Sequence, residues 1–243
     1  MLDQQFRKIP THIQGLDEAL GGGIPRGHVV LVTGLPGTMK SSLVFAILTG
    51  CARHEGLKSL YVSLEQTEQS LRNQMLAMGC SSSEDDLVDL LDLSKFQLEL
   101  GRGAHKVWVD FLKNAMKTQR ETRGVGLVAL DSLEAFEVLA SFKDRRTELF
   151  RLFEWLRGLE VTTLIITESP PESRIPALGY RTERNDEDYL SDGIIQLRMH
   201  QVSDLEVQRR IRIVKMRGTR HRTGDFALVF EGGSFSVVKP MSA

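Results

Sequence analysis

The stretch Gly34-Leu-Pro-Gly-Thr-Met-Lys-Ser41 decides the fold, because it connects a run of apolar residues to a stretch with helical spacing. The run from His28 to Thr33 is typical of a buried strand, and the pattern that follows predicts a helix from Ser41 to Arg53. A loop between a strand and a helix can aim several backbone N–H groups and the positive end of the helix dipole at one polyanion. The stretch therefore predicts a phosphate-binding loop inside an α/β domain.

The pattern around this loop agrees with such a domain. Further apolar runs typical of buried strands are Ser59 to Leu64, Val88 to Leu93, Val125 to Leu130 and Val161 to Thr167. Between them, apolar residues recur at helical steps, as they do from Thr67 to Met78 and from Leu149 to Leu156. Strands that alternate with helices need crossover connections, which predicts a mainly parallel, doubly wound sheet covered on both faces.

The C-terminal part of the sequence has a different pattern. Four strands are predicted there: Gly193 to His200, Glu206 to Met216, Phe226 to Phe230 and Ser234 to Val238. The turn residues Glu231-Gly232-Gly233 join the last two, so C-terminal antiparallel β-hairpins are expected. A length of 243 residues suits one large α/β domain and is short for two, so residues 1–243 are interpreted as a single domain.

Composition limits the compartment and the partners. The sequence has 31 Lys and Arg against 32 Asp and Glu, a balance that gives no reason to expect nucleic acid or a membrane as partner. The first residues, Met1 to His12, lack the apolar run of a signal peptide, and no stretch reaches the roughly 18 apolar residues of a membrane-spanning helix. Cys51 and Cys80 have no metal-ligand spacing and fit a reducing compartment as core or surface thiols. A cytoplasmic protein is expected.

The phosphate-binding loop assigns a role to each of its residues. The predicted phosphate-binding residues are Gly34, Gly37, Thr38, Met39, Lys40, Ser41 and Ser42. Lys40 can reach the terminal phosphates, and the hydroxyl of Ser41 stands where a Mg²⁺ ligand is needed. Met39 departs from the consensus, which has glycine there, so its side chain must point away from the phosphates. Two interpretations of Met39 stay open: a weakened or slowed nucleotide site, or a tolerated variant with intact binding.

Two carboxylates end predicted strands. Asp131 ends the apolar strand that starts at Gly126, the form of a Walker B element whose carboxylate holds the Mg²⁺ shell. Glu65 follows the strand that ends at Leu64, at the edge of the sheet where ligands of doubly wound folds bind. There it can orient a water and accept its proton. The alternatives are a strand-capping role for Asp131 and, for Glu65, a place at the start of the helix near Thr67.

With these residues in place, the sequence resembles KaiC and the RecA-superfamily ATPases around it nearly from end to end. The resemblance rests on the phosphate loop, Glu65 and the Asp131 strand together with the blocks Arg7 to Thr11, Gly15 to Gly27, Ile165 to Glu168, Asp188 to Ile195 and Lys215 to His221. It implies a RecA-type P-loop NTPase fold that binds ATP with Mg²⁺ and hydrolyses ATP slowly. The choice of ATP over GTP depends on this resemblance alone.

Three departures from the family limit what the resemblance implies. The family typically has a Glu-Glu pair where this sequence has Glu65-Gln66, so only Glu65 inherits the role of base. Asp188-Tyr189 stand where the second domain of the clock protein has its autophosphorylated Ser-Thr pair, so that phosphorylation cycle is not expected. The clock protein also has two such domains in tandem and this sequence has one, so no circadian function follows from the family name.

A pair of cations predicts a contact with a neighbouring subunit. Lys215 and Arg217 are two residues apart on a predicted strand, so both side chains leave by the same face. The resemblance implies that this pair reaches the γ-phosphate of the next subunit, as an arginine finger does. A finger that acts in trans requires a ring, so a homohexamer is expected. The alternative is a solvated basic edge strand.

Three functional hypotheses remain. The preferred one is a nucleotide-driven ring ATPase that acts as a switch or scaffold on protein partners that the sequence does not identify. The second is a RadA-like recombination protein, against which the segment from Glu168 to Leu190 argues, because it carries three arginines and six acidic residues and offers no basic groove for single-stranded DNA. The third is a nucleotide-binding module with little turnover, suggested by Met39 and Gln66.

Overall fold

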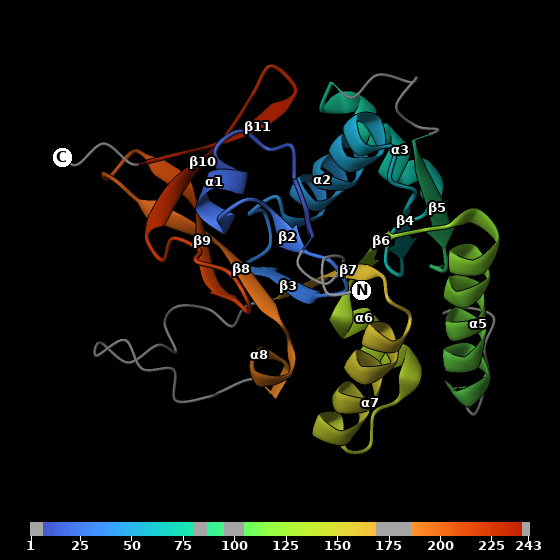
Figure 1. Ribbon diagram of the computed structural model, residues 1–243. Helices are drawn as coiled ribbons and strands as arrows, with labels where there is room; N and C mark the ends of the chain where they lie inside the picture. Colours follow the sequence, from blue (N-terminus) through green and yellow to red (C-terminus); the bar gives the residue numbers. More distant parts are fainter. Residues whose placement is uncertain (1–6, 80–86, 95–104, 169–185, 240–243) are drawn as a thin grey trace.

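A large β-sheet organises the molecule (Figure 1). The computed structural model describes residues 7–79, 87–94, 105–168 and 186–239, and within these ranges the sheet has nine strands in the order β11-β10-β9-β8-β3-β7-β6-β4-β5. The strands are β3 (Val29–Gly34), β4 (Ser59–Ser63), β5 (Val88–Asp92), β6 (Leu127–Asp131), β7 (Thr162–Glu168), β8 (Gly193–Gln201), β9 (Val207–Met216), β10 (Asp225–Glu231) and β11 (Ser234–Val238). A small antiparallel sheet pairs β1 (Lys8–Ile9) with β2 (Ile24–Pro25).

The strands from β8 to β5 form the parallel part of the sheet. β3 pairs in parallel with β7 and β8, β6 pairs in parallel with β7 and β4, and β4 pairs in parallel with β5. Every residue of β3 and β4 is buried, which explains why these strands are continuous apolar runs. The predicted mainly parallel sheet is confirmed, with strand ends that differ from the predicted ones by one or two residues.

The C-terminal strands extend this sheet in antiparallel fashion. β9 pairs with β8 and β10, and β10 pairs with β11. Glu231 pairs with Ser234, and the two glycines between them, Gly232 and Gly233, have φ angles of 56° and 77°. A two-residue hairpin turn needs positive φ at both central residues, and glycine adopts it without steric cost. The predicted C-terminal hairpins are therefore confirmed.

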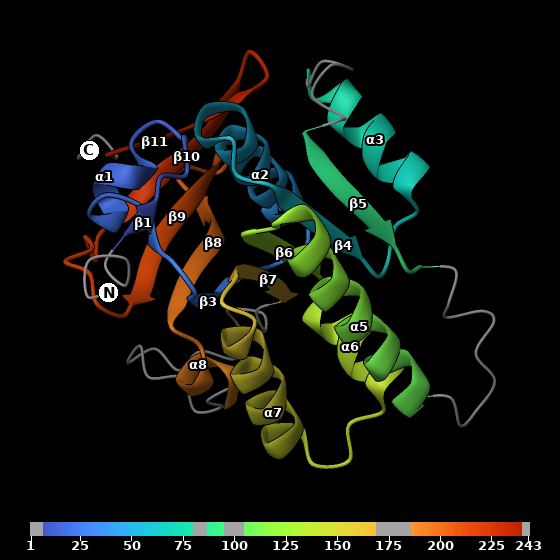
Figure 2. The same ribbon diagram turned by 45° about the vertical axis from the view of Figure 1, so that its right-hand side comes forward.

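Helices cover both faces of the sheet, as Figure 2 shows from a second side. One layer holds α1 (Leu16–Leu20), α2 (Lys40–Glu55) and α3 (Glu68–Ala77), and the other holds α5 (His105–Arg123), α6 (Leu133–Ala140) and α7 (Arg145–Gly158). The short helix α8 (Asp186–Leu190) contacts α7. Among the described helices, none is long and apolar enough to cross a lipid bilayer.

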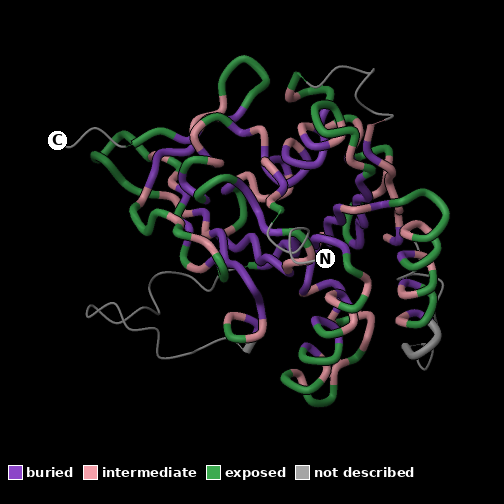
Figure 3. The backbone as a smooth tube through the Cα atoms, in the orientation of Figure 1, coloured by how far each residue is buried: buried purple, intermediate pink, exposed green. Residues whose placement is uncertain are grey.

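Alternate residues of the central strand β3 belong to two separate cores. Val30 and Val32 pack with the α1–α3 layer, whereas Val29 and Leu31 pack with the α5–α7 layer. This is the period of two that a strand imposes on its side chains. Leu31 is fully buried, so its truncation to alanine is expected to cost about 2 to 5 kcal/mol. Figure 3 shows buried residues along the central strands and exposed ones on the outer helix faces.

Cys51 lies inside the first of these cores, on α2. Its thiol is buried and donates a hydrogen bond to the carbonyl oxygen of Pro10 at 3.2 Å. Burial, helped by the negative charges of Asp17 and Glu55, raises the pKa of the Cys51 thiol to about 12. The predicted structural role is therefore confirmed for Cys51, while Cys80 lies outside the described residues.

Candidate functional site

The carboxyl ends of four adjacent strands, β3, β7, β6 and β4, bring most of the predicted site residues to one edge of the sheet. Gly34 lies opposite Glu168 of β7, and Ser63 lies opposite Asp131 of β6. Glu65 follows β4 two residues after Ser63. Open α/β sheets bind their ligands at this edge. The phosphate loop, Asp131 and Glu65 are therefore neighbours in space. In the sequence, Glu65 lies 31 positions after Gly34 and Asp131 lies 97 positions after it.

The phosphate loop connects β3 directly to α2. A side chain at Gly34 would place its Cβ 2.6 Å from the carbonyl oxygen of Leu197, so only glycine fits at the start of the loop. Thr38 closes the turn, because its hydroxyl donates to the carbonyl oxygen of Leu35 at 2.7 Å. Gly37 has a φ of 81°, which is the left-handed conformation that glycine adopts freely. The loop is therefore shaped by its glycines, by the Thr38 hydroxyl and by the close approach of β8 to Gly34.

Met39 is the residue immediately before α2, and its backbone is left-handed, with φ 71° and ψ 33°. This conformation costs a residue with a Cβ roughly 1 to 2 kcal/mol. The Met39 side chain is half-buried against the core of the α1–α3 layer. The structure therefore explains why glycine is the consensus residue here. The effect of Met39 on turnover stays a prediction.

Lys40, the first residue of α2, is folded back onto the loop. Its Nζ donates to the carbonyl oxygens of Gly34 at 2.8 Å and Leu35 at 3.2 Å. Burial lowers the pKa of Lys40 from its ordinary value. The nearby carboxylates that oppose this lowering are, in decreasing order of effect, Glu168, Glu134, Asp131 and Glu65. The ammonium group therefore stands at the centre of an acidic site.

Asp131 is held by two hydroxyl groups. The hydroxyl of Tyr61 on β4 donates to Oδ2 of Asp131, and the Ser41 side chain is also hydrogen-bonded to this carboxylate. Burial raises the pKa of Asp131, and the two hydroxyl groups oppose that effect. Burial, and then the charge of Asp131, raises the pKa of Tyr61 well above its ordinary value. Sequence analysis missed Tyr61; the available signal was a tyrosine inside an otherwise apolar strand.

The pair of Ser41 and Asp131 fits a Mg²⁺ ion. Both supply oxygen, which this cation prefers, and Mg²⁺ in phosphate sites takes only one or two protein groups beside phosphate oxygens and water. Among the described residues, no group of three or more His, Cys, Asp or Glu could hold a metal by itself. The donor set therefore suits an ion that arrives with a nucleotide.

Glu65 contacts the end of β6. The hydroxyl of Ser132, the residue after Asp131, donates to Oε1 of Glu65. The helix that follows Glu65 starts at Glu68, and its N-cap is Thr67, whose side chain accepts from the backbone N–H of Ser70. The hydrogen bond from Ser132 thus joins Glu65 to the strand that ends at Asp131. The alternative role for Glu65, at the start of the next helix, is filled by Thr67.

Glu134 is a further carboxylate at this edge that sequence analysis did not select. It lies in the first turn of α6, and its Oε1 accepts from the Thr167 hydroxyl at 2.6 Å and the Glu168 N–H at 2.8 Å. Its Oε2 is buried and has no hydrogen-bond partner within the described residues. Its place three residues after Asp131, in the turn that leaves the sheet edge, could have indicated it.

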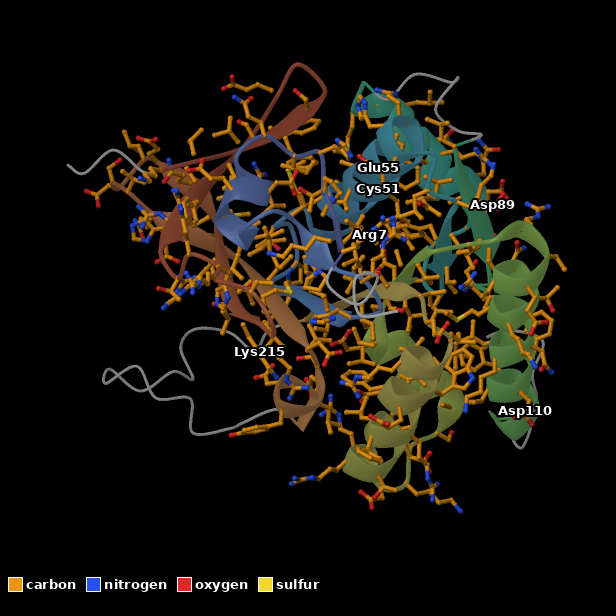
Figure 4. All side chains as sticks on the ribbon, viewed as in Figure 1. Arg7, Cys51, Glu55, Asp89, Asp110 and Lys215 are labelled. Carbon is orange, nitrogen blue, oxygen red and sulfur yellow. The ribbon has the colours of Figure 1, made fainter. Side chains whose placement is uncertain are left out.

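Lys215 and Arg217 converge on one segment of their own chain, residues 188–192. Nζ of Lys215 donates to the carbonyl oxygens of Ser191 at 2.6 Å and Asp188 at 2.9 Å. Arg217 donates from Nη1 to Oδ1 of Asp192 at 2.9 Å. Burial, and then the charge of Arg217, lowers the pKa of Lys215. Figure 4 shows Lys215 beside α8.

The structure thus brings together the phosphate loop, Asp131 and Glu65, and it holds Lys215 and Arg217 as a separate pair. The prediction that both cations lie on one strand is wrong for Arg217, because β9 ends at Met216. Both side chains nevertheless bond to segment 188–192. The acidic segment that argues against binding of single-stranded DNA falls mostly on residues 169–185, which lie outside the described residues.

Comparison with known proteins identifies relatives of the chain. The family model described as "ATPase: KaiC" matches residues 9–241. The circadian clock oscillator protein KaiC of Thermostichus vulcanus is 28% identical over 239 residues, which are 94% of this chain and 44% of that protein. A UPF0273 protein of Aeropyrum pernix is 31% identical over 228 residues, which are 88% of this chain and 86% of that protein.

A solved structure has the same fold. The KaiC-like protein of the hyperthermophilic archaeon Pyrococcus horikoshii matches 96% of this chain and 99% of its own, with a TM-score of 0.77 and 24% sequence identity. The predicted fold class is confirmed by this likeness. The chain spans less than half the length of the clock proteins that it matches, with 40% and 44% of two of them covered.

Proposed function

Since the chain belongs to the KaiC family of ATPases, a family of nucleotide-binding proteins, we propose that it is a slow, Mg²⁺-dependent ATPase that works as a homohexameric ring. The ring would act as a nucleotide-driven switch or scaffold. The observation that carries the proposal is the meeting of the phosphate loop, Asp131 and Glu65 at one edge of the sheet.

The phosphate loop supplies the binding energy. The backbone N–H groups of the loop and the N-terminus of α2 attract the phosphates of ATP. Lys40 exchanges the carbonyl oxygens of Gly34 and Leu35 for phosphate oxygens, which are stronger partners because they are charged. Ser41 and Asp131 would hold Mg²⁺, which neutralises charge between the β- and γ-phosphates when it is bound.

Glu65 handles the attacking water. The oxygen of the water bonds to the γ-phosphorus while the bond to the bridging oxygen breaks, and ADP leaves with that electron pair. The proton released by the water goes to the carboxylate of Glu65. The hydrogen bond from Ser132 keeps one oxygen of Glu65 in place, so the other oxygen can face the water.

The neighbouring subunit completes the site. Lys215 and Arg217 donate to carbonyl and carboxylate oxygens of their own chain, and in a ring they would exchange some of these bonds for the γ-phosphate of the adjacent subunit. A head-to-tail contact of this kind closes into cyclic symmetry. Localisation in the cytoplasm is part of the proposal, which includes neither nucleic acid nor a membrane as partner.

The test is phosphate release from Mg²⁺-ATP, with the mass of the assembly measured on the same sample. Lys40→Ala should abolish nucleotide binding, Glu65→Gln should retain binding and stop turnover, and Arg217→Ala should stop turnover in the assembled ring. Arg209→Ala is the matched control, because Arg209 is an exposed arginine on β9. A monomer that hydrolyses ATP unaffected by Arg217→Ala would refute the trans-acting ring.

The left-handed backbone of Met39 favours a second function, that of a nucleotide-binding module with little turnover. Met39→Gly removes the steric cost of φ 71° and lets the loop adjust around the transferred phosphoryl group. Saturable ATP binding without phosphate release in the wild type, together with turnover in Met39→Gly, would establish this second function in place of the first.

A further inference from the structure

Glu134 occupies a special place at the edge that carries the phosphate loop. It lies in the turn that follows β6, and its hydrogen bonds reach Thr167 and Glu168 at the end of β7. β7 is the direct neighbour of β3, where Gly34 lies opposite Glu168. Glu134 is thereby held over the strands next to the phosphate loop, and its charge acts on Lys40 more strongly than that of Asp131 does.

The two oxygens of the Glu134 carboxylate differ in their surroundings. Oε1 accepts two hydrogen bonds, which fix the orientation of the group. Oε2 is buried and has no partner among the residues that the structure describes. Leaving a buried acceptor without a partner is energetically unfavourable. In a folded protein such an atom calls for an explanation, of which a catalytic role or a bound water is one.

The chemistry of the site limits what that partner can be. Phosphate oxygens of ATP carry negative charge and no hydrogen, so they would repel a carboxylate. The pair that fits Mg²⁺ lies elsewhere, because Asp131 is bonded to Tyr61 on β4 and to Ser41, whereas Glu134 is bonded to β7. A water molecule between the γ-phosphate and the protein satisfies both conditions, since it donates hydrogen bonds and is neutral.

We propose that Glu134 is a second water-orienting carboxylate of this site, which rests on the proposed ATPase function. Oε2 of Glu134 accepts one hydrogen of the attacking water, and the other hydrogen faces Glu65, which takes the proton as the oxygen bonds to the γ-phosphorus. Glu134 takes no proton in this step, and the bridging oxygen of ADP receives the electron pair of the broken bond. Thr167 positions Glu134 by donating to the opposite oxygen, Oε1.

The test compares Glu134→Gln with the wild type. Glutamine keeps the shape and one acceptor oxygen, which can still receive the hydrogen bonds from Thr167 and Glu168, but it replaces Oε2 by an NH₂ group that donates. We expect kcat to fall about 10²-fold, the low end of the range for a group that handles the proton or the water. KM and the affinity for Mg²⁺-ADP should stay unchanged.

A binding experiment gives a readout other than turnover. Calorimetry would measure the affinity for Mg²⁺-ADP with aluminium fluoride, which mimics the transferred phosphoryl group with its attacking water, and the affinity for Mg²⁺-ADP alone. The wild type should bind the fluoride complex more tightly, and Glu134→Gln should lose most of that difference. Asp110→Asn is the control, because Asp110 is an exposed carboxylate on α5 away from the sheet edge (Figure 4). Thermal denaturation would check that each variant is folded.

The outcomes separate this inference from the proposed function. Glu134→Gln with wild-type turnover would overturn the inference and leave the ATPase intact. The inference would also be overturned if Glu134→Gln lowered the affinity for Mg²⁺-ADP as much as the affinity for the fluoride complex. Glu134 would then support the loop or the metal. A wild type with neither turnover nor tighter binding of the fluoride complex would overturn both proposals. Thr167→Val should lower kcat less than Glu134→Gln, because it removes only the positioning hydroxyl.

Discussion

Asp192 joins three parts of the molecule, and its replacement by asparagine gives a sharp prediction. One oxygen, Oδ2, accepts from the backbone N–H of Val29 and from Nε of Arg157, both at 3.0 Å. The other, Oδ1, accepts from Arg157 at 3.2 Å and from Arg217 at 2.9 Å. The residue is only 7% exposed. Asp192→Asn keeps the shape, removes the charge and turns one acceptor oxygen into a donor that faces donors.

The loss of stability expected for Asp192→Asn follows from the three partners of Asp192. The Val29 N–H at the start of β3 is buried, and leaving it without an acceptor costs about 1 to 3 kcal/mol. The pair with Arg157 is mostly buried, whereas the Arg217 side chain is 52% exposed, so its pair contributes at most about 1 kcal/mol. Together, a loss of about 3 to 5 kcal/mol is expected, as for one partner removed from a buried ion pair. For a domain of this size, that lowers Tm by about 6 to 20 °C.

The pH dependence of this effect has a definite sign. Burial raises the pKa of Asp192, but the hydrogen bonds from Arg157 and from the Val29 N–H outweigh it, so the pKa lies below its ordinary value of 3.8. A carboxyl group with a lowered pKa stabilises the folded state above the unfolded pKa, and that stability is lost as the pH falls through the folded pKa. The Tm difference between wild type and Asp192→Asn should therefore be full at pH 7 and shrink below pH 3.8.

Calorimetric unfolding of both proteins at pH 7 and at successively lower pH would measure this difference. Arg217→Ala is the matched comparison, because it removes only the exposed partner and should lower Tm far less. Equal Tm values at pH 7, or a difference that grows as the pH falls, would show that Asp192 does not anchor β3 and α7 by its charge.

Three further predictions concern single side chains. Tyr61→Phe removes a buried donor to Asp131, so the Mg²⁺ concentration needed for half-maximal nucleotide binding should rise, and an unchanged Mg²⁺ titration would contradict a positioning role for Tyr61. Thr67→Ala removes the N-cap of α3 and should lower the free energy of unfolding by about 0.5 to 2 kcal/mol, measured by thermal denaturation. ATP turnover should stay unchanged, and a fall in turnover would show that α3 also positions Glu65. Cys51, whose pKa is about 12, should be alkylated by iodoacetamide only after unfolding, and mass spectrometry of the peptide that contains it would reveal any labelling of the folded protein.

Much of the fold could be predicted because its central strands are buried on both faces. Such strands have the continuous apolar runs that β3 and β4 show, and the loop after Gly34 fixes the order of strand and helix. The short elements β1, β2 and α1 could not be predicted in this way. They depend on tertiary contacts, such as the Asp17 carboxylate that accepts from the N–H and the hydroxyl of Thr11, and strands of two residues have no period to detect.

Residues of the candidate site could be predicted where a local sequence pattern identifies them. They could not be predicted where their role depends on contact with a residue far away in the sequence. Lys40, Ser41 and Asp131 stand at fixed places in local patterns. The roles suggested for Tyr61 and Glu134 depend instead on contacts with Asp131 and Thr167, which lie 70 and 33 positions away in the sequence. A tyrosine in a strand and a glutamate in the first turn of a helix are ordinary residues until the register of the sheet places their partners beside them.

The pair of Lys215 and Arg217 shows the same limit of prediction from the sequence. Lys215 and Arg217 were predicted to share a direction because both were placed on one strand, but β9 ends at Met216, and direction alone does not identify a target. The structure supplies one within the chain, segment 188–192, and Asp192 in that segment also holds the first residue of β3. β3 ends in the phosphate loop, so the pair and the loop are attached to opposite ends of one six-residue strand. If the pair moves to the phosphate of a neighbouring subunit, Arg217 gives up its bond to Asp192, and the remaining bonds from Arg157 and Val29 keep β3 in place.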